Sequence, residues 1–179
     1  AFVLLRLRAE GLEPAAEAEK TTLIRRVTLD LTGLPPTPAA YREVLAQGAR
    51  WDYETVVDQL MASPRYGERW GRHWLDVARY ADSNGLDENA AHAHAWRYRD
   101  YVIGALNDDK PLDRFFTEQI AGDLLPHESV QQRRQQLIAT GYLAIGPWTL
   151  QNYIKGQLAA DVVDHQIDRI GRTFLGQTV

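Results

Sequence analysis

Residues 66–82 read YGERWGRHWLDVARYAD, and the spacing in this stretch decides the fold class. Its apolar residues recur every three or four positions, which is the period of an α-helix and not of a strand. They are Trp70, Trp74, Val77 and Ala81. Polar residues at the same intervals follow on the neighbouring side: Arg69, His73, Asp76 and Tyr80. The stretch therefore predicts one continuous helix with an apolar side next to a polar side.

Helix start and stop signals divide the rest of the chain in the same way. Ser63-Pro64 and Thr37-Pro38 each place a capping side chain before a proline that suits a first helical position. Gly33 stands where a helix C-terminal cap belongs, and the corner at 33–36 contains two prolines. Further helices are expected over residues 2–9, 17–31, 53–62, 96–106, 112–121, 130–143 and 159–174. No stretch shows the strict alternation of a hairpin strand.

Composition supports one globular unit without a membrane span. The chain has 179 residues, of which 45% are hydrophobic and 25% charged, and this length and balance fit a single domain with a packed core. A net charge of −4 argues against nucleic acid and anionic lipid as partners. No apolar run approaches the roughly 20 residues that a bilayer requires. We therefore predict an all-α fold: a compact, irregular multi-helix single domain over residues 1–179, with Pro/Gly-rich corners.

The polar side of residues 66–82 is the first candidate for chemistry. Arg69, His73, Asp76, Arg79, Tyr80 and Asp82 supply donors and acceptors beside two tryptophans. They would either line a cleft or form a buried network that locks helices together. His73 and Asp76 have the residue types of an oriented imidazole and its carboxylate partner. No cysteine is present and no serine stands in a nucleophile context, so a triad hydrolase is disfavoured.

A second group of candidates lies further along the chain. Arg97, Arg99 and Asp100 alternate with aromatic residues, and the two arginines would either bind a carboxylate ligand or pair with Asp76, Asp82 or Asp123. Glu118, Gln119 and Asp123 lie around the expected end of a helix. Two of the carboxylates among Asp76, Asp82, Asp100, Glu118 and Asp123 would suit glycoside hydrolysis, provided that their separation fits that reaction.

Residues 82–94 combine oxygen-bearing side chains around a glycine with His92 and His94. Such a composition is found in calcium loops and in transition-metal sites, but the full twelve-residue calcium pattern is missing. An Asn-Gly pair flanked by acids is also ordinary turn chemistry. We therefore treat this segment as a solvated loop and assign no metal site to it.

Several long motifs together resemble a known family. They are RR at 25–26, LDLTGLPPT at 29–37, SPRYGERW at 63–70, HWLDVARYAD at 73–82, YRDYVI at 98–103, EQIAGDLLP at 118–126, ATGY at 139–142 and GRTFLG at 171–176. They span nearly the whole chain and resemble the domain of unknown function associated with planctomycete-type cytochrome c. Residues 86–95 match that family less clearly.

The resemblance implies a setting but no established reaction. In that family, the stretch similar to residues 174–179 is normally followed directly by a Cys-x-x-Cys-His haem-attachment motif. This implies that the chain is a fragment of a larger extracytoplasmic protein, with a cytochrome c domain or other domains of the same polypeptide as partners. The chain has no cysteine, so a c-type haem would belong to the full-length protein and no cofactor to this chain.

Three functions remain open at this point. The first is a binding or scaffold role in electron transfer, next to a c-type haem unit. The second is an enzyme that acts on complex polysaccharides through Asp, His and Arg side chains. The third is a purely structural or assembly domain.

Overall fold

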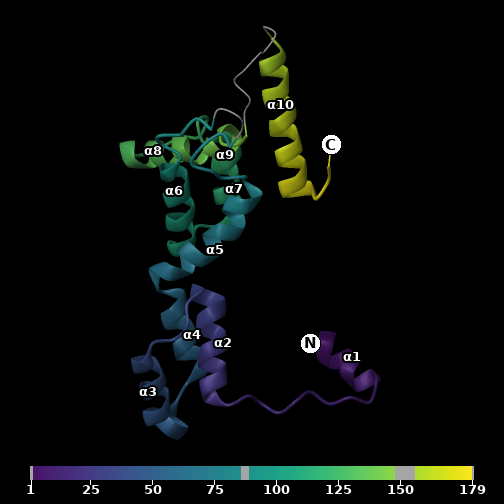
Figure 1. Cartoon of the computed structure of the whole chain (residues 1–179), viewed down its shortest axis with the longest axis vertical. Helices are drawn as coiled ribbons and strands as arrows, with labels where there is room; N and C mark the ends of the chain where they lie inside the picture. Colours follow the sequence, from purple (N-terminus) through teal and green to yellow (C-terminus); the bar gives the residue numbers. More distant parts are fainter. Residues whose placement is uncertain (1, 86–88, 148–155, 179) are drawn as a thin grey trace.

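The computed structural model describes residues 2–85, 89–147 and 156–178, and its regular elements there are helices (Figure 1). They are α1 (Phe2–Ala9), α2 (Lys20–Thr32), α3 (Pro38–Gln47), α4 (Tyr53–Met61), α5 (Pro64–Val77), α6 (Trp96–Asn107), α7 (Leu112–Ala121), α8 (Val130–Ala139), α9 (Gly141–Ala144) and α10 (Gln157–Ile170). A 3₁₀ turn η1 (Gly48–Arg50) follows α3, and a π-helical turn η2 (Gly171–Leu175) follows α10. The predicted all-α class is confirmed.

The predicted caps form as expected. Gly33 ends α2 with a left-handed φ of 72°, and its N–H donates to the carbonyl of Leu29. The hydroxyl of Thr37 accepts the N–H of Ala40 at the start of α3, and Ser63 caps α5 with Pro64 at its first position. These caps satisfy backbone groups that a helix end leaves free. They set the corners that separate α2, α3 and the α4–α5 pair.

Glycine allows α5 and α6 to approach closely. A Cβ at Gly67 would lie 2.5 Å from the carbonyl oxygen of Ile103 and 2.6 Å from Oδ1 of Asn107. The Gly67 N–H donates to that same Asn107 oxygen at 2.8 Å. Gly71 also faces Ile103, one turn further along α5. The side of α5 that packs on α6 is therefore built around two glycines and Leu75, all of them buried.

This arrangement corrects the predicted apolar side of α5. Trp74 enters the core, but Trp70 is 41% and Val77 45% exposed. Side-chain hydrophobicity alone predicted the wrong side for these two residues, because the closest helix contact is made through backbone.

The main core is aromatic and lies where α5, α6, α7 and α9 meet the C-terminal segment. The indole of Trp74 contacts four other rings, with centroid distances from 4.9 to 6.3 Å. These rings belong to Phe115, Phe116, Tyr142 and Phe174. Aromatic pairs at such distances add to the stabilisation from burial. This core fixes the surfaces on which the polar candidates lie.

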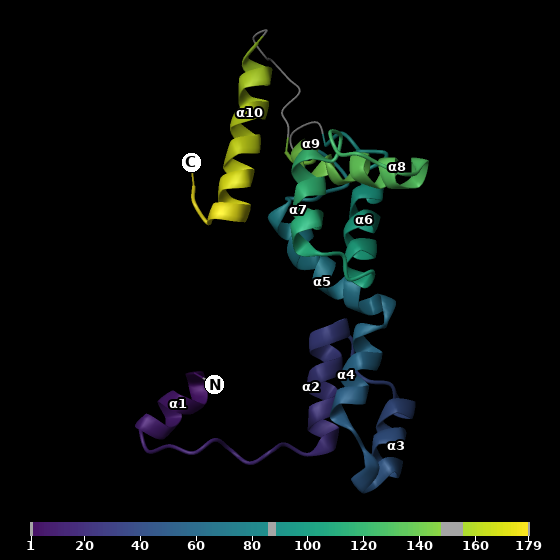
Figure 2. The ribbon, with the colours of Figure 1, turned by 180° about the vertical axis from the view of Figure 1, so that it is seen from behind.

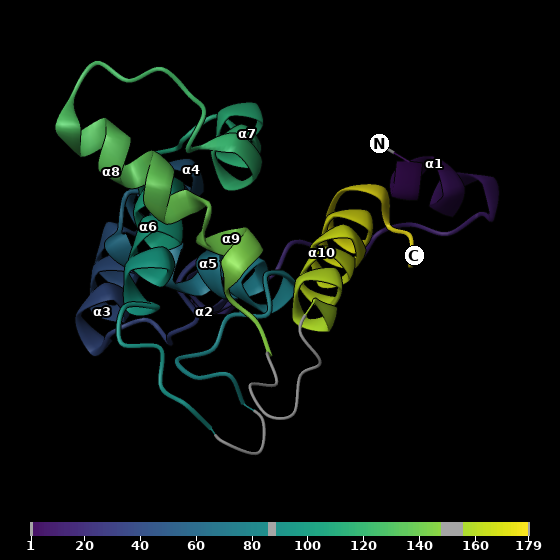
Figure 3. The same ribbon diagram turned by 90° about the horizontal axis from the view of Figure 1, so that it is seen from above.

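Viewed from the two sides in Figures 1 and 2, α5 lies between the α2–α4 group and the α6–α9 group. Seen from above in Figure 3, α10 stands beside this body, and α1 lies apart from it at the end of an extended segment. No residue of α1 is buried. None of the described helices has the length and apolar character needed to cross a bilayer.

Two predicted helices end earlier than expected. The helix predicted over residues 66–82 ends at Val77, because Arg79 takes a left-handed φ of 56°. The N–H of Tyr80 then bonds to the carbonyl of Leu75, and that of Arg79 bonds to Asp76, which is the hydrogen-bond pattern of a Schellman motif. The helix predicted over 130–143 divides at Thr140, whose hydroxyl donates to the carbonyl of Leu137.

Candidate functional site

Four of the predicted residues line one polar hollow between α5 and α6. They are Asp76, Tyr80, Asp82 and Arg99, and the hollow has a volume of about 460 Å³. Asp76 lies on α5, Arg99 lies on α6, and the segment after the Schellman turn supplies the other two. The left-handed backbone at Arg79 thus directs the chain across the end of α5. Spacing on a single helix is not what brings these residues together.

Most of the charged side chains that line the hollow are already hydrogen-bonded to other side chains. Nε of Arg72 lies 2.9 Å from Oδ1 of Asp76. The hydroxyl of Tyr80 donates to Oδ1 of Asp82 at 2.5 Å. Burial and the Asp82 carboxylate together raise the pKa of Tyr80 to about 12, so its hydroxyl remains a donor at neutral pH. The hollow therefore offers carboxylates that are already paired and a phenol that stays protonated.

The remaining residues on α5 point elsewhere. The ring of His73 lies 5.3 Å from that of Trp70 and does not line the hollow. Asp76 pairs with Arg72, so the structure does not form the imidazole–carboxylate pair considered for His73 and Asp76. The side chain of Arg69 lies against Gly33, where its Cδ is 2.9 Å from the position of a Cβ.

Arg97, Arg99 and Asp123 take partners that differ from those considered for them, and Arg79, for which no partner was predicted, binds a residue of α10. Nη2 of Arg79 lies 2.7 Å from Asp168 on α10. The guanidinium of Arg97 lies over the ring of its neighbour Trp96. Arg99 pairs with the adjacent Asp100 at 3.0 Å. Arg133 donates to the backbone carbonyl of Asp123. The predicted pairing of Arg97 and Arg99 with Asp76, Asp82 or Asp123 does not form.

The contact between Arg79 and Asp168 belongs to a network that sequence analysis did not identify. Asp168 also accepts from Arg172 at 2.6 Å, and the hydrogen bonds from Arg172 and Arg79 lower the pKa of its carboxyl. The next residue, Arg169, is only 2% exposed and donates to the carbonyl of Tyr142. Its guanidinium lies 5.7 Å from the centroid of the Tyr142 ring. These contacts hold the end of α10 against α9 and the turn after α5.

Glu118 is buried, and three neighbouring side chains donate hydrogen bonds to its carboxylate. Its carboxylate is 2% exposed and accepts from Lys110 at 2.6 Å, Tyr101 at 2.7 Å and Arg114 at 3.1 Å. Burial raises the pKa of Glu118, but these three hydrogen bonds outweigh it and the net pKa lies below the ordinary value. Glu118 is therefore an ionised structural centre and does not open to solvent.

Gln119 is also buried, next to Glu118, and completes a chain of side-chain hydrogen bonds. The indole N–H of Trp74 donates to the hydroxyl of Tyr98 at 2.9 Å, and that hydroxyl donates to Oε1 of Gln119 at 2.7 Å. Gln119 is fully buried. The two residues predicted as functional at the end of α7 thus link helices to one another.

The loop considered for a metal uses its described oxygens in turn geometry. Ser83 bonds to the side chain of Asn89, and Oδ1 of Asn84 accepts the N–H of Ala90. Residues 86–88 lie outside the described part of the chain. Among the described residues, no group of three or more His, Asp or Glu side chains is placed to share a metal ion. His92 and His94 line a separate hollow against α8 and α9.

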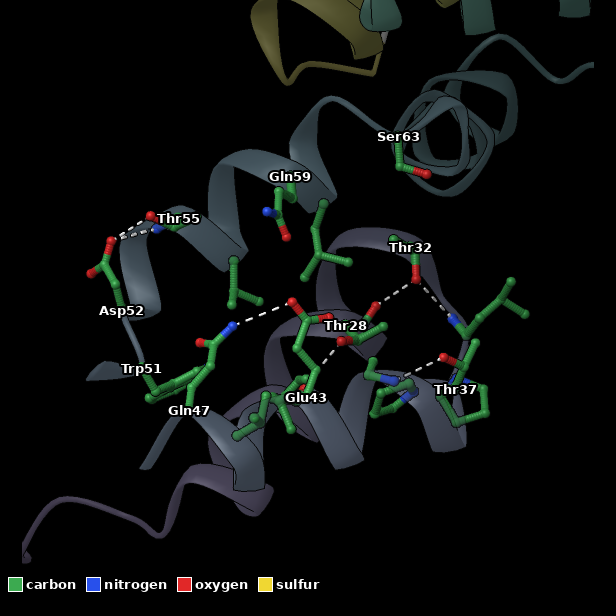
Figure 4. A pocket seen from close by; sticks show the side chains of 18 of the residues that line it. Thr28, Thr32, Thr37, Glu43, Gln47, Trp51, Asp52, Thr55, Gln59 and Ser63 are labelled. Atoms are coloured by element: carbon green, nitrogen blue, oxygen red, sulfur yellow. Dashed lines mark hydrogen bonds between the residues drawn. The ribbon is translucent and has the colours of Figure 1, made fainter. Parts of the chain in front are cut away.

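A larger pocket lies between α2, α3 and α4, and sequence analysis missed it (Figure 4). Its volume is about 600 Å³, within the usual range for small-molecule sites. Apolar residues from all three helices form part of its wall: Ile24, Val44, Val56 and Leu60. In Figure 4, Glu43 of α3 and Gln59 of α4 both project into the space, above Thr28 of α2. The rigid corner at 33–36 was the feature of the sequence that could have indicated this pocket, since it separates α2 from α3.

One comparison with known proteins identifies the family. The family model described as PSCyt2, a protein of unknown function (DUF1549), matches residues 1–179. The chain belongs to this family. No curated protein and no solved structure matches the chain. Membership of the PSCyt2 family assigns no reaction to the chain.

Proposed function

We propose that this PSCyt2 domain is a non-catalytic binding and scaffold domain of a larger extracytoplasmic protein, and that it packs against a unit carrying a c-type haem. The observation that carries the proposal is the two-sided character of the C-terminal segment. One side of α10 and η2 is anchored in the domain, and the segment also exposes large apolar side chains, with Asp164 beside two of them. The absence of cysteine from the sequence means that the haem would be attached outside these 179 residues.

The anchored side contacts the rest of the domain through a few specific side chains. Arg169 is buried against Tyr142, Asp168 pairs with Arg79 and Arg172, and Phe174 contacts the core aromatics. The exposed side presents Val163 at 52%, Ile167 at 48% and Leu175 at 66% exposure. Val163 and Ile167 are four residues apart and so share one face of the helix. Apolar patches of this kind mark interaction surfaces on soluble proteins.

The total accessible surface of the chain is larger than that expected for a compact monomer of the same mass. It amounts to 12497 Å², whereas a folded monomer of 20.3 kDa exposes about 8,800 Å² by the usual size scaling. Part of this excess belongs to α1, none of whose residues is buried, and to the exposed segment after it, and the exposed face of α10 contributes as well. A neighbouring domain seated on α10 would remove part of it from water. The family resemblance, which places a haem motif just beyond the residues similar to 174–179, favours a haem unit as this neighbour.

The internal pairing of the candidate residues supports a role without catalysis. The buried Glu118 carboxylate accepts from neighbouring side chains, Oε1 of the buried Gln119 accepts from Tyr98, and Arg79 binds Asp168. Perturbed pKa values at such positions belong to structural networks as well as to active sites. The strongest polar interactions of the domain therefore hold helices in place.

The test uses the full-length protein with the double substitution Val163→Asp and Ile167→Asp. Two charges on this face would separate the haem unit from α10, so the haem reduction potential should shift and protease should release the two parts more readily. Val130→Asp is the matched control, because Val130 is 84% exposed on α8. An unchanged potential and digestion pattern in the double variant would reject the proposal.

A second candidate is an enzyme that acts on complex polysaccharides. The observation in its favour is that Asp76 and Asp82 line one hollow together with Arg99. Product release from a glycan panel, measured for the wild type and for Asp76→Asn and Asp82→Asn, tests it. Turnover that both variants retain would remove these carboxylates from any such reaction.

A further inference from the structure

We propose that the pocket between α2, α3 and α4 binds a small amphipathic amine, with its apolar body between the helices and its ammonium group on Glu43. The pocket is separate from the α10 face and from the hollow at Asp76. Three features carry the proposal: the apolar wall, the hydrogen-bond state of the polar groups and the position of the Glu43 carboxylate.

The wall fits an apolar body. Ile24 and Val44 are each 3% exposed and pack where α2 meets α3, while Val56 and Leu60 contribute from α4. A cavity of about 600 Å³ has room for a ring with a short chain. Removing such a group from water stabilises the complex by about 25 cal/mol per Å² of apolar surface buried.

Three of the four threonine hydroxyls that line the pocket donate their protons within the protein, whereas the hydroxyl of Thr37 accepts the N–H of Ala40. Thr28 donates to the carbonyl of Ile24, Thr32 to that of Thr28, and Thr55 to the carboxylate of Asp52. A hydroxyl that has donated its single proton can act toward a ligand only as an acceptor. These three hydroxyls therefore favour a ligand that brings hydrogen-bond donors, while the indole N–H of Trp51, buried without a partner among the described residues, can donate to an acceptor on the same ligand.

Glu43 supplies the charge that such a donor needs. In Figure 4 its carboxylate projects into the middle of the pocket, and Nε2 of Gln47 donates to it at 3.3 Å. A carboxylate held from one side keeps further lone pairs for an ammonium group, and a charge-assisted hydrogen bond is about twice as strong as a neutral one.

Other charges line the pocket but are less suited to hold a ligand. The carboxylate of Asp52 caps α4 through Thr55, and Arg65 pairs with Glu68 on α5. Arg50, in the exposed turn η1, is the cation that would select an anion instead. The charge of the ligand that binds therefore shows which residue is the anchor: a cation indicates Glu43, and an anion indicates Arg50.

The experiment measures binding of three matched probes by calorimetry: 2-phenylethylamine, 2-phenylethanol and 3-phenylpropanoate. They share the apolar body and differ in the head group. The amine should bind about tenfold more tightly than the alcohol, the low end for a charge-assisted contact at a solvent-exposed carboxylate. Equal affinities, a preference for the carboxylate, or no binding of any probe would overturn the proposal.

Two isosteric variants test whether Glu43 is the cause of the preference for the amine. Glu43→Gln should abolish the preference for the amine while the alcohol still binds. Glu54→Gln makes the same change in net charge on α4, outside the pocket lining, and should keep the preference. Circular dichroism serves to check that both variants remain folded. A preference that survives Glu43→Gln, or one that Glu54→Gln also removes, would contradict a direct contact with Glu43.

Discussion

The ammonium of Lys110 lies 2.6 Å from the carboxylate of Glu118, and only 2% of the Glu118 side chain is exposed. The two residues join the end of α6 to α7, and Tyr101 and Arg114 complete the site. An ionised group this deeply buried depends on all of its partners. The contact is therefore a polar position at which substitution should be costly.

Glu118→Gln should lower the free energy of unfolding by about 2 kcal/mol, because hydrogen bonds to a charged group are replaced by weaker ones and Lys110 loses its counter-charge. Urea unfolding followed by circular dichroism measures the change. Glu128→Gln, at an exposed position before α8, should change it by less than about 0.5 kcal/mol. A loss of equal size in both variants would show that the buried site has no special role.

The same pair makes stability dependent on pH with a definite sign. The pKa of Glu118 is lower in the folded state than its ordinary value of 4.5, so the unfolded chain binds the proton more readily. The stabilisation is complete well above pH 4.5 and is lost as the pH falls through the lowered folded-state pKa. The difference in unfolding free energy between wild type and Glu118→Gln should be constant near neutral pH and shrink below pH 4.5. A difference that grows on acidification would contradict the assignment.

Gly67→Ala should destabilise the domain by about 1–3 kcal/mol, because its Cβ would meet the Ile103 backbone at 2.5 Å and α5 would have to move from α6. Gly104→Ala is the control within α6, since nothing lies within 4 Å of its Cβ position. It should leave stability unchanged or raise it by up to about 1 kcal/mol. Thermal unfolding of the two variants gives the comparison, and equal effects would exclude a close helix contact at Gly67.

Tyr98→Phe should cost about 2 kcal/mol, because it leaves the Trp74 indole N–H and the Gln119 amide without their shared partner in a buried site. Tyr53→Phe removes a hydroxyl from a side chain that is 39% exposed and should be nearly neutral. Chemical denaturation measures both. A neutral Tyr98→Phe would indicate that the hydroxyl is not needed to link α5, α6 and α7.

Local signals in the sequence predicted the fold class and most corners. The caps at Gly33, Thr37 and Ser63 depend on a few adjacent residues, and all three form as predicted. The end of α5 was not predictable in this way, because an arginine occupies the left-handed position where glycine is usual. The buried side of α5 was partly wrong because it depends on how closely another helix approaches Gly67.

The candidate site was less predictable than the fold, for a related reason. Sequence analysis selected Asp76, Tyr80, Asp82 and Arg99, and the structure brings these four to one hollow. Some of the other candidates contact adjacent residues, as Arg97 does with Trp96, but one important partner lies far away in sequence. The partner of Arg79 is 89 positions distant, and no periodicity indicates it. The pocket at Glu43 was missed because three separate helices supply its wall.

The separation of 89 positions between Arg79 and Asp168 also bears on the order in which the chain folds. Ordering a long intervening segment costs entropy before the contact can contribute, so distant pairs form late while neighbouring helices form early. The α5–α6 hairpin would act as the nucleus, and α10 would dock last. We therefore expect the C-terminal segment, together with the apolar side chains that it exposes, to dock in the final step of folding.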